Sequence, residues 1–241
     1  MGDNMGLLLK YIFIFFLGST IGYVLELFYR RWEHGKWINP GFLVGPYLPI
    51  YGFGLVIMNI ISVEFNKLNL PIYVTIIVIG LGMTLLELIG GLIFLKQGIR
   101  LWDYRKELFN FKGVICPFFT MIWTIIGGIY CFFIESRLLT AIDWFNIHKS
   151  FSFVLGMFMG ILIIDFGYST ELFNKIKSYA QNNNMDIMYE KLKLHINDIK
   201  KNNKERYSFV LPFSQTSNLK EYISQYFEKY KNSEGKKGDK K

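Results

Sequence analysis

Five apolar stretches constrain the fold of this chain more than any other feature of its sequence. Each is close in length to the ~20 helical residues that cross a hydrocarbon core of ~30 Å. Polar side chains are few, and residues 7–25 contain, besides tyrosine, only Lys10, Ser19 and Thr20. Helices of a soluble α-protein would need polar outer faces, which these stretches lack. We therefore predict an all-α, polytopic membrane helix bundle with spans at about residues 7–28, 42–63, 71–95, 114–134 and 151–170.

Charge divides the chain into two parts. Of the 241 residues, 51% are hydrophobic, yet the formal net charge is +8. Residues 1–170 hold 12 Lys/Arg and 10 Asp/Glu, whereas residues 171–241 hold 15 and 9. This division argues against one soluble globular domain, a disordered chain and a secreted disulfide scaffold. We expect a transmembrane domain at 1–170, a cytoplasmic amphipathic helical tail at 171–231 and a disordered basic end at 232–241.

The loop charges predict the orientation of the spans, because cytoplasmic loops are enriched in Lys and Arg. The stretch 29–41 contains three such residues and 96–113 contains five, whereas 64–70 contains one and 135–150 contains two. We therefore expect a multi-pass protein of the cell (inner/plasma) membrane, with its N-terminus outside and its first loop, third loop and tail in the cytoplasm. Positive charge follows the first apolar core instead of preceding it, so we expect this span to remain as an anchor.

The tail has a helical periodicity of its own, with apolar residues recurring at helical spacing in 188–199 and 219–230. Basic amphipathic helices suit an anionic membrane surface, where each Lys or Arg is worth ~1 kcal/mol. Packing of the two helices on each other or under the bundle is an equal alternative. No recognised module frames the charges, so we expect no nucleic-acid partner.

The first candidate site feature is a stripe of small residues that ends in a carboxylate. Gly18, Gly22 and Glu26 are four residues apart and share one face of the first span. Glycines let a neighbouring helix approach closely, so Glu26 would face protein instead of lipid. Tyr23 of the same motif joins the candidate site. The alternative is a packing motif in which Glu26 pairs with Arg30.

The third span carries a second carboxylate, Glu87, about eight residues or ~12 Å from its cytoplasmic end. An ionisable group at that depth is costly and is a candidate for a functional site. Gly80, Thr84 and Gly91 share its face. The alternatives are a protonated carboxyl group and a structural ion pair with one of two arginines, Arg100 or Arg105.

The second span begins with residues that break helices, since residues 39–54 contain three prolines and four glycines. Each internal proline removes a backbone donor and clashes with the preceding turn. Irregular backbone at membrane depth is tolerated only where it is buried in protein or lines a wet cavity. We therefore predict an irregular or re-entrant start of this span, and a tightly packed kink without a ligand is the alternative. The candidate residues here are Asn39, Gly45, Pro46, Pro49 and Tyr51.

The third loop, residues 100–113, combines cations with aromatic residues. Arg100, Asp103 and Asn110 could hold a phosphate or a lipid head group, helped by the neighbouring basic side chains. Trp102 and Tyr104 fit the membrane interface, where aromatic belts occur. An ordinary basic loop with anchoring aromatic residues is the alternative.

Taken together, these motifs resemble a known family. They are Gly22-Tyr23-x-x-Glu26, Gly41-Phe42-Leu43-x-Gly45-Pro46-x-x-Pro49-Ile50-Tyr51-Gly52, Leu86-Glu87, Trp102-Asp103-Tyr104, Phe109-Asn110 and Gly113. In order and spacing they are similar to those of the ABC-transporter type IV, or CmpB-like, membrane family, over roughly residues 8–140. The resemblance implies a small multi-pass membrane protein labelled as a transporter permease, and it carries no catalytic residues over to this chain.

The leading functional hypothesis is a transporter or permease component with a cytoplasm-facing polar cavity. Glu26, Glu87 and the segment 39–54 would line the cavity, and the loop 102–113 would cap it. No Gly-x-x-x-x-Gly-Lys-Ser/Thr phosphate loop occurs, so transport would need a separate ATPase subunit or an ion gradient. A homo-oligomer would add spans to the five of one chain.

Two other hypotheses stay open at this point. One is a membrane enzyme or binding protein that acts on an anionic lipid or isoprenoid head group. The other is an assembly or regulatory protein that recruits a partner through its tail. The sequence does not decide whether the chain is an enzyme. We expect no metal site and no cofactor, and the lipid bilayer is the one certain partner.

Overall fold

The computed structural model describes residues 2–182, 186–202 and 221–228. Helices dominate this part of the chain, and its two strands have two residues each. The elements are, in order, α1 (Gly2–His34), α2 (Pro49–Lys67), α3 (Ile72–Leu95), β1 (Ile99–Arg100), α4 (Pro117–Ile129), a π-helical segment (Tyr130–Ile134), α5 (Glu135–Ile147), a 3₁₀ turn (Lys149–Phe151), α6 (Ser152–Asn182), β2 (Ile187–Met188) and α7 (Tyr189–Asn202). Residues 221–228 form a further short helix. The predicted all-α bundle is confirmed.

Five helical segments are long and apolar enough to cross a membrane, as the sequence predicts. They are Gly6–His34, Pro49–Lys67, Ile72–Leu95, Pro117–Ile147 and Lys149–Ser178. Their outer faces are apolar, and α3 shows this most regularly. Large side chains recur every four residues along it and are about half exposed: Ile77, Leu81, Leu85, Ile89 and Ile93. Such a continuous apolar stripe suits contact with lipid and not with water.

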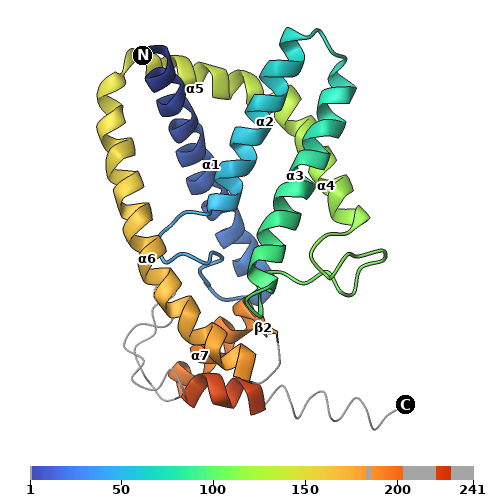
Figure 1. Cartoon of the computed structure of the whole chain (residues 1–241), viewed down its shortest axis with the longest axis vertical. Helices are drawn as coiled ribbons and strands as arrows, with labels where there is room; N and C mark the ends of the chain where they lie inside the picture. Colours follow the sequence, from blue (N-terminus) through green and yellow to red (C-terminus); the bar gives the residue numbers. More distant parts are fainter. Residues whose placement is uncertain (1, 183–185, 203–220, 229–241) are drawn as a thin grey trace.

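The chain passes from one end of the bundle to the other with each long helix. α1 runs from the end that carries the N-terminus to the opposite end, where α7 lies (Figure 1). We call this opposite end the tail-side end. The connections 35–48 and 96–116 lie there, whereas the turn between α2 and α3 and the helix α5 lie at the N-terminal end.

The helix α2 begins at Pro49, although its apolar stretch begins at residue 42. The backbone of Leu48 is extended, and residues 39–48 form bends without a regular helix. Pro49 lies in the first turn of α2, where its missing N–H is not needed, whereas Pro46 would interrupt a longer helix. The predicted break at the start of the second span is therefore confirmed.

The fourth span differs from the predicted one at the N-terminal end of the bundle. We expected it to end at residue 134 and a loop to follow, but the helix continues through one π-helical turn into α5. α5 crosses the N-terminal end of the bundle toward α6 (Figure 1). Leu138, Ile142 and Phe145 are buried, and Phe145 stacks on Phe13 with ring centroids 4.8 Å apart. The spacing of these three residues is that of an amphipathic helix, which explains why the predicted loop is helical.

Glycines bring α1 and α2 close together. A Cβ atom on Gly22 would collide with the Cβ and ring of Tyr51, and one on Gly18 would lie 2.8 Å from the Tyr51 carbonyl oxygen. The same kind of contact joins α3 to α4, where a Cβ on Gly127 would lie 2.8 Å from Ile79. The small residues of α1 are therefore packing positions, and the stripe that ends at Glu26 faces α2.

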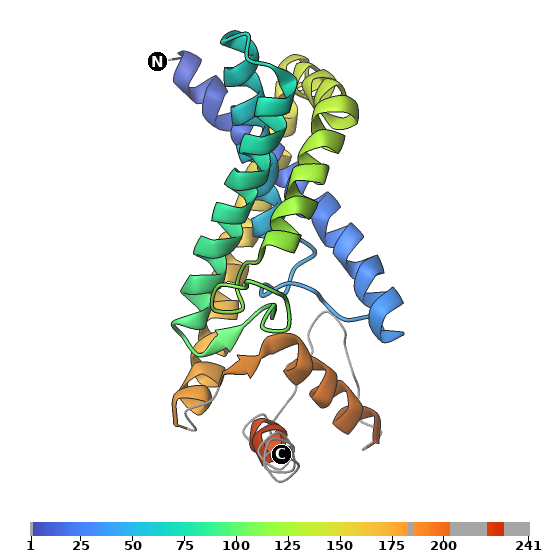
Figure 2. The same cartoon turned by 90° about the vertical axis from the view of Figure 1, so that its right-hand side faces the viewer.

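The tail covers the tail-side end of the bundle. β2 pairs with β1 in parallel, with Ile187 opposite Ile99, and α7 and the helix 221–228 lie beneath the bundle (Figure 2). Buried apolar residues of both tail helices form one core with Phe173 and Ile176 of α6. The apolar faces of these helices thus pack under the bundle, which is the second of the two alternatives above. The predicted disordered end at 232–241 lies outside the described residues.

We predict that Gly22→Ala lowers the thermal stability of the purified chain in detergent by several degrees. The added methyl group has no room beside Tyr51, and overpacking of this kind costs ~1–3 kcal/mol. Gly160→Ala on α6 is the matched control, because no atom lies within 4 Å of its Cβ position. Unfolding midpoints followed by tryptophan fluorescence test this, and equal midpoints for the two variants would contradict the close packing.

Candidate functional site

The irregular segment 39–48 is anchored by a carboxylate from α6. Asp165 accepts hydrogen bonds from the backbone N–H of Val44 at 3.1 Å, from that of Gly45 at 2.7 Å and from the Tyr47 hydroxyl at 2.6 Å. Ser169, one turn further along α6, donates a fourth at 2.9 Å. Asp165 therefore holds the broken start of the second span against the fifth.

Asn39 organises the same segment from within. Its side-chain oxygen accepts the backbone N–H of Gly41 at 2.9 Å, and its amide group donates to the carbonyls of Leu43 at 3.0 Å and Val44 at 2.9 Å. The N–H of Leu48 donates to the carbonyl of Ser19 on α1 at 3.0 Å. Asn39, a predicted site residue, is thus engaged in holding the turn, as is the backbone N–H of Gly45. This arrangement is what a tightly packed kink requires.

A lysine from the tail binds the carbonyl groups of this segment, whereas Asp165 binds its N–H groups. Lys193 of α7 donates to the carbonyls of Asn39 at 2.9 Å and Gly41 at 2.6 Å. Its ammonium group lies 4.4 Å from the centroid of the Tyr189 ring, and the residue is only 3% exposed. Burial lowers the pKa of Lys193 to about 7, against the opposing effect of the Glu190 charge. The broken segment therefore connects α6, through Asp165, with the tail.

Glu26 lies between α1 and α2 as the glycine stripe predicts. It accepts the Tyr51 hydroxyl at 2.8 Å and the Arg30 Nε at 3.0 Å. The packing alternative, in which Glu26 pairs with Arg30, therefore describes part of its environment. Tyr23 from the same motif is buried, at 5% exposure.

Arg30 also joins α1 to the tail. It donates to Glu190 of α7, whose other oxygen lies 2.7 Å from His34 Nε2. Glu33, His34 and Glu190 offer ligand atoms within 4.8 Å of one another, a grouping that could hold a metal ion. The Arg30 guanidinium, however, donates to Glu190 and lies 3.5 Å from Glu33. Since these carboxylates already share a cation of the protein, the cluster is an ion-pair contact between α1 and α7.

Glu87 is buried, at 5% exposure, and both of its oxygens accept hydrogen bonds from aromatic side chains. The Tyr104 hydroxyl donates at 2.7 Å and the Trp123 Nε1 at 3.1 Å. The two arginines named in the ion-pair alternative have other acidic partners. Arg100 donates to Asp186 at 2.9 Å, and Arg105 donates to Asp103.

The third loop is held together by its own side chains. Trp102 Nε1 donates to the carbonyl of Val114 at 2.8 Å. Asn110 accepts the N–H of Gly113 at 2.9 Å and donates to the carbonyl of Glu107 at 2.9 Å. Asn110 thus shapes the loop, and carboxylates engage both of its arginines.

Four of the predicted site residues meet inside the tail-side half of the bundle. Glu26 bonds Tyr51 and Glu87 bonds Tyr104, and the two pairs are close enough for Tyr51 to interact electrostatically with Glu87 and Tyr104. We call these four residues the polar cluster. Asn39, Gly45 and Pro46 lie in the anchored segment, and Pro49 begins α2.

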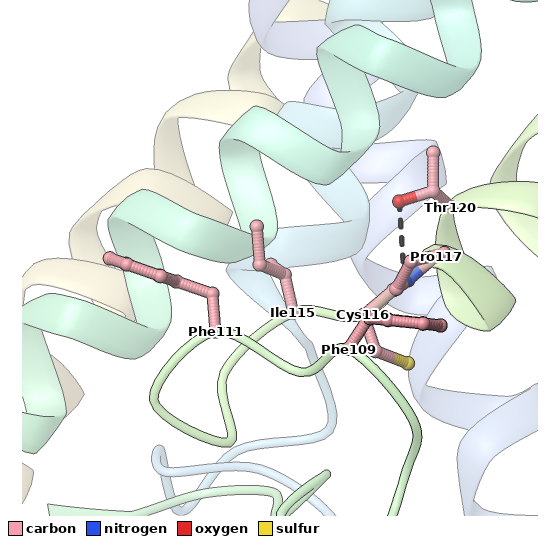
Figure 3. A pocket seen from close by; sticks show the side chains of 6 residues that line it. All are labelled: Phe109, Phe111, Ile115, Cys116, Pro117 and Thr120. Carbon is pink, nitrogen blue, oxygen red and sulfur yellow. Dashed lines mark hydrogen bonds between the residues drawn. The ribbon is translucent and has the colours of Figure 1, made fainter.

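A separate pocket of about 350 Å³ lies below the start of α4 (Figure 3). Its lining is mostly apolar and includes no member of the polar cluster. The lining residues are Phe109, Phe111, Ile115, Cys116, Pro117 and Thr120.

The comparisons with known proteins identify the family. The family described as “Putative ABC-transporter type IV” matches residues 13–170. The chain belongs to this family. The comparison with curated proteins finds no match, and neither does the comparison with solved structures. The matched region of this ABC-transporter-type family includes α5 and α6 up to residue 170, beyond the resemblance at 8–140.

Two residues that hold the segment 39–48 in this chain were not among the site residues predicted from the sequence. Asp165 is an acidic residue in the apolar run of the fifth span, and this signal alone could have ranked it beside Glu26 and Glu87. Lys193 had no such signal, because lysines are common in the tail and its partners lie more than 150 residues earlier.

We predict that Asp165→Asn destabilises the protein. An asparagine offers one side-chain oxygen where the carboxylate accepts four hydrogen bonds from two backbone N–H groups, Tyr47 and Ser169. A buried donor left without a partner costs ~1–3 kcal/mol. The matched control is Asp143→Asn on the exposed face of α5. Thermal midpoints in detergent should fall for Asp165→Asn only, and a midpoint equal to that of the control would argue against the anchoring role.

Proposed function

We propose that this chain is the membrane-embedded component of an ABC-type transporter and that its polar cluster lines the route of the transported solute. Membership of an ABC-transporter-type family and five apolar helices support a membrane transport component. The polar cluster lies where α1, α2 and α3 converge, on the side of the bundle nearer the tail. A route for a solute through that region would pass Glu26 and Glu87.

One observation carries the proposal: Glu87 is a buried carboxylate whose hydrogen-bond donors are neutral. Tyr104 and Trp123 both donate to it, and neither brings the positive charge that a structural ion pair would. A carboxylate within a membrane bundle is costly and is retained where it has a function. A solute with a positive charge or a hydrogen-bond donor would gain from replacing these aromatic donors. This favours Glu87 as a solute-contacting group.

The chain lacks a phosphate-binding loop of the Gly-x-x-x-x-Gly-Lys-Ser/Thr type, so ATP would be hydrolysed by a separate subunit. We place that subunit on the cytoplasmic side, at the tail-side end. The stretches 29–41 and 96–113, which include the last turn of α1, lie at this end and carry eight Lys and Arg in total, which supports a cytoplasmic location. The N-terminus would then lie outside.

Cysteine labelling tests this orientation. Lys67→Cys lies at the last residue of α2 and Lys106→Cys in the third loop, and both are made with Cys116 and Cys131 replaced by serine. In intact cells a membrane-impermeant maleimide should label Lys67→Cys and should reach Lys106→Cys only after lysis. The reverse pattern would overturn the orientation.

We predict that Glu87→Gln reduces transport at least ~10-fold while the protein still folds, because losing a hydrogen bond to a charged group costs ~1.5–3 kcal/mol. The assay compares inside-out vesicles of the native host with and without the chain, and mass spectrometry identifies solutes whose ATP-dependent movement requires it. Glu64→Gln is the matched control, since Glu64 is exposed and pairs with Lys67 at the opposite end. An unchanged solute profile in a well-folded Glu87→Gln variant would contradict a role in transport.

A further inference from the structure

The helix α4 begins well short of the end of its neighbour α3. The two helices run in opposite directions, and a Cβ on Gly80 of α3 would touch the backbone of Thr124 on α4 at 3.0 Å. Pro117 on α4 and Glu87 on α3 each lie seven residues from this contact, toward the tail-side end. α3 then continues for eight residues to Leu95, which is ~12 Å of helix. Two turns that would complete α4 are therefore missing on that side.

The loop 101–116 occupies the space of these missing turns. A Cβ on Gly91 of α3 would lie 3.1 Å from Trp102 and would collide with Val114, so both side chains pack on the last turns of α3. Tyr104 reaches Glu87, two turns before the end of α3, at 2.7 Å. Since α3 is a membrane-spanning helix, the loop beside its last turns lies at the depth of the membrane boundary and not in free solvent.

The outer surface of this loop is apolar. Leu108 is 80% exposed and Phe109 88%. Phe111 and Phe118 are about half exposed, and Phe118 begins the exposed apolar stripe of α4 that continues through Met121. Large apolar side chains so fully exposed at membrane depth are suited to contact lipid chains.

The pocket below α4 opens among these residues (Figure 3). Its one hydroxyl group, on Thr120, already donates to the carbonyl of Cys116 and accepts from Thr84. Its remaining lining is aromatic, aliphatic, proline and cysteine side chains. Such a lining favours a hydrocarbon occupant over a polar solute.

Positive charge borders the pocket. Lys106 and Lys112 are exposed, and the Lys112 ammonium group lies 5.6 Å from the ring centroid of Phe111, a lining residue. The loop's arginine, Arg105, is neutralised by Asp103. The two lysines outweigh Glu107 and leave the loop that lines much of this apolar pocket basic, which complements a molecule with an anionic head and a hydrocarbon chain.

We propose that this pocket binds one acyl chain of an anionic phospholipid, with the phosphate between Lys106 and Lys112. The lipid would cover the exposed apolar side chains of the loop that takes the place of the missing turns of α4. This site is distinct from the polar cluster, and the proposal does not depend on the transported solute. A bound lipid would hold the loop that supplies Tyr104 to Glu87.

Native mass spectrometry of the full chain in mild detergent tests the charge part of the proposal. The probes are phosphatidylglycerol and phosphatidylcholine with identical acyl chains, added in equal amounts. The wild type should retain phosphatidylglycerol preferentially. The double variant Lys106→Gln/Lys112→Gln should lose roughly 30-fold of this preference, since each basic residue is worth ~1 kcal/mol near an anionic surface and tenfold is ~1.4 kcal/mol. The charge-matched control Lys67→Gln/Lys149→Gln, at the opposite end, should keep it.

A variant that fills the pocket tests the acyl-chain part. Ile115→Trp should lower the retained phosphatidylglycerol by one molecule per chain, whereas Ile125→Trp on the exposed stripe of α4 should not. Glycerol phosphate, which has the head group without the chain, should not displace the lipid. Equal retention of the two lipids by the wild type, a preference that survives the lysine substitutions, or displacement by glycerol phosphate would each overturn the proposal.

Discussion

The hydrogen bonds of the irregular segment 39–48 are the constraint on which the tail-side half of the structure depends. Backbone groups outside a helix cannot be left unpaired in an apolar bundle. Here the N–H groups of the segment meet a carboxylate, Asp165, and two of its carbonyls meet an ammonium group, Lys193. The N–H groups thus pair with an acidic side chain, and the carbonyl oxygens pair with a basic one. Because these partners come from α6 and α7, the segment that precedes α2 is held by both the fifth span and the tail.

The late starts of α2 and α4 have a common consequence. Tyr51 in the first turn of α2 packs on Gly22, and α1 continues for twelve residues beyond that point to His34, which is ~18 Å. α3 likewise extends ~12 Å beyond the start of α4. Two long helices therefore project past two short ones at the tail-side end, and irregular segments fill the difference. The polar cluster lies beside these irregular segments. Tyr51 comes from the first turn of α2, directly after the segment 39–48, and Tyr104 comes from the third loop.

Features that depend on local sequence were predictable, and those that depend on distant partners were not. The five spans and the break before Pro49 follow from hydrophobicity and from proline chemistry, which act within a few residues. The partners of Glu87 are Tyr104 and Trp123, 17 and 36 residues away, and the sequence offered an arginine only as an alternative, because charge complementarity was the only guide to a partner. Asp165 is 120 residues from Gly45, so its role required the fold.

The ion pairs of the tail show that the positive charge near the loops has a second role besides indicating orientation. Loop and helix-end cations mark one side of the membrane, but several are paired with acids of the tail: Arg30 with Glu190, Lys36 with Asp198 and Arg100 with Asp186. These cations therefore bind the tail to the bundle and are less available to lipid head groups. Lys106 and Lys112 have no such acidic partner among the described residues, and they lie in the loop that lines much of the apolar pocket. Positive charge at this end is thus divided between cations that hold the tail and cations that remain unpaired for the proposed lipid.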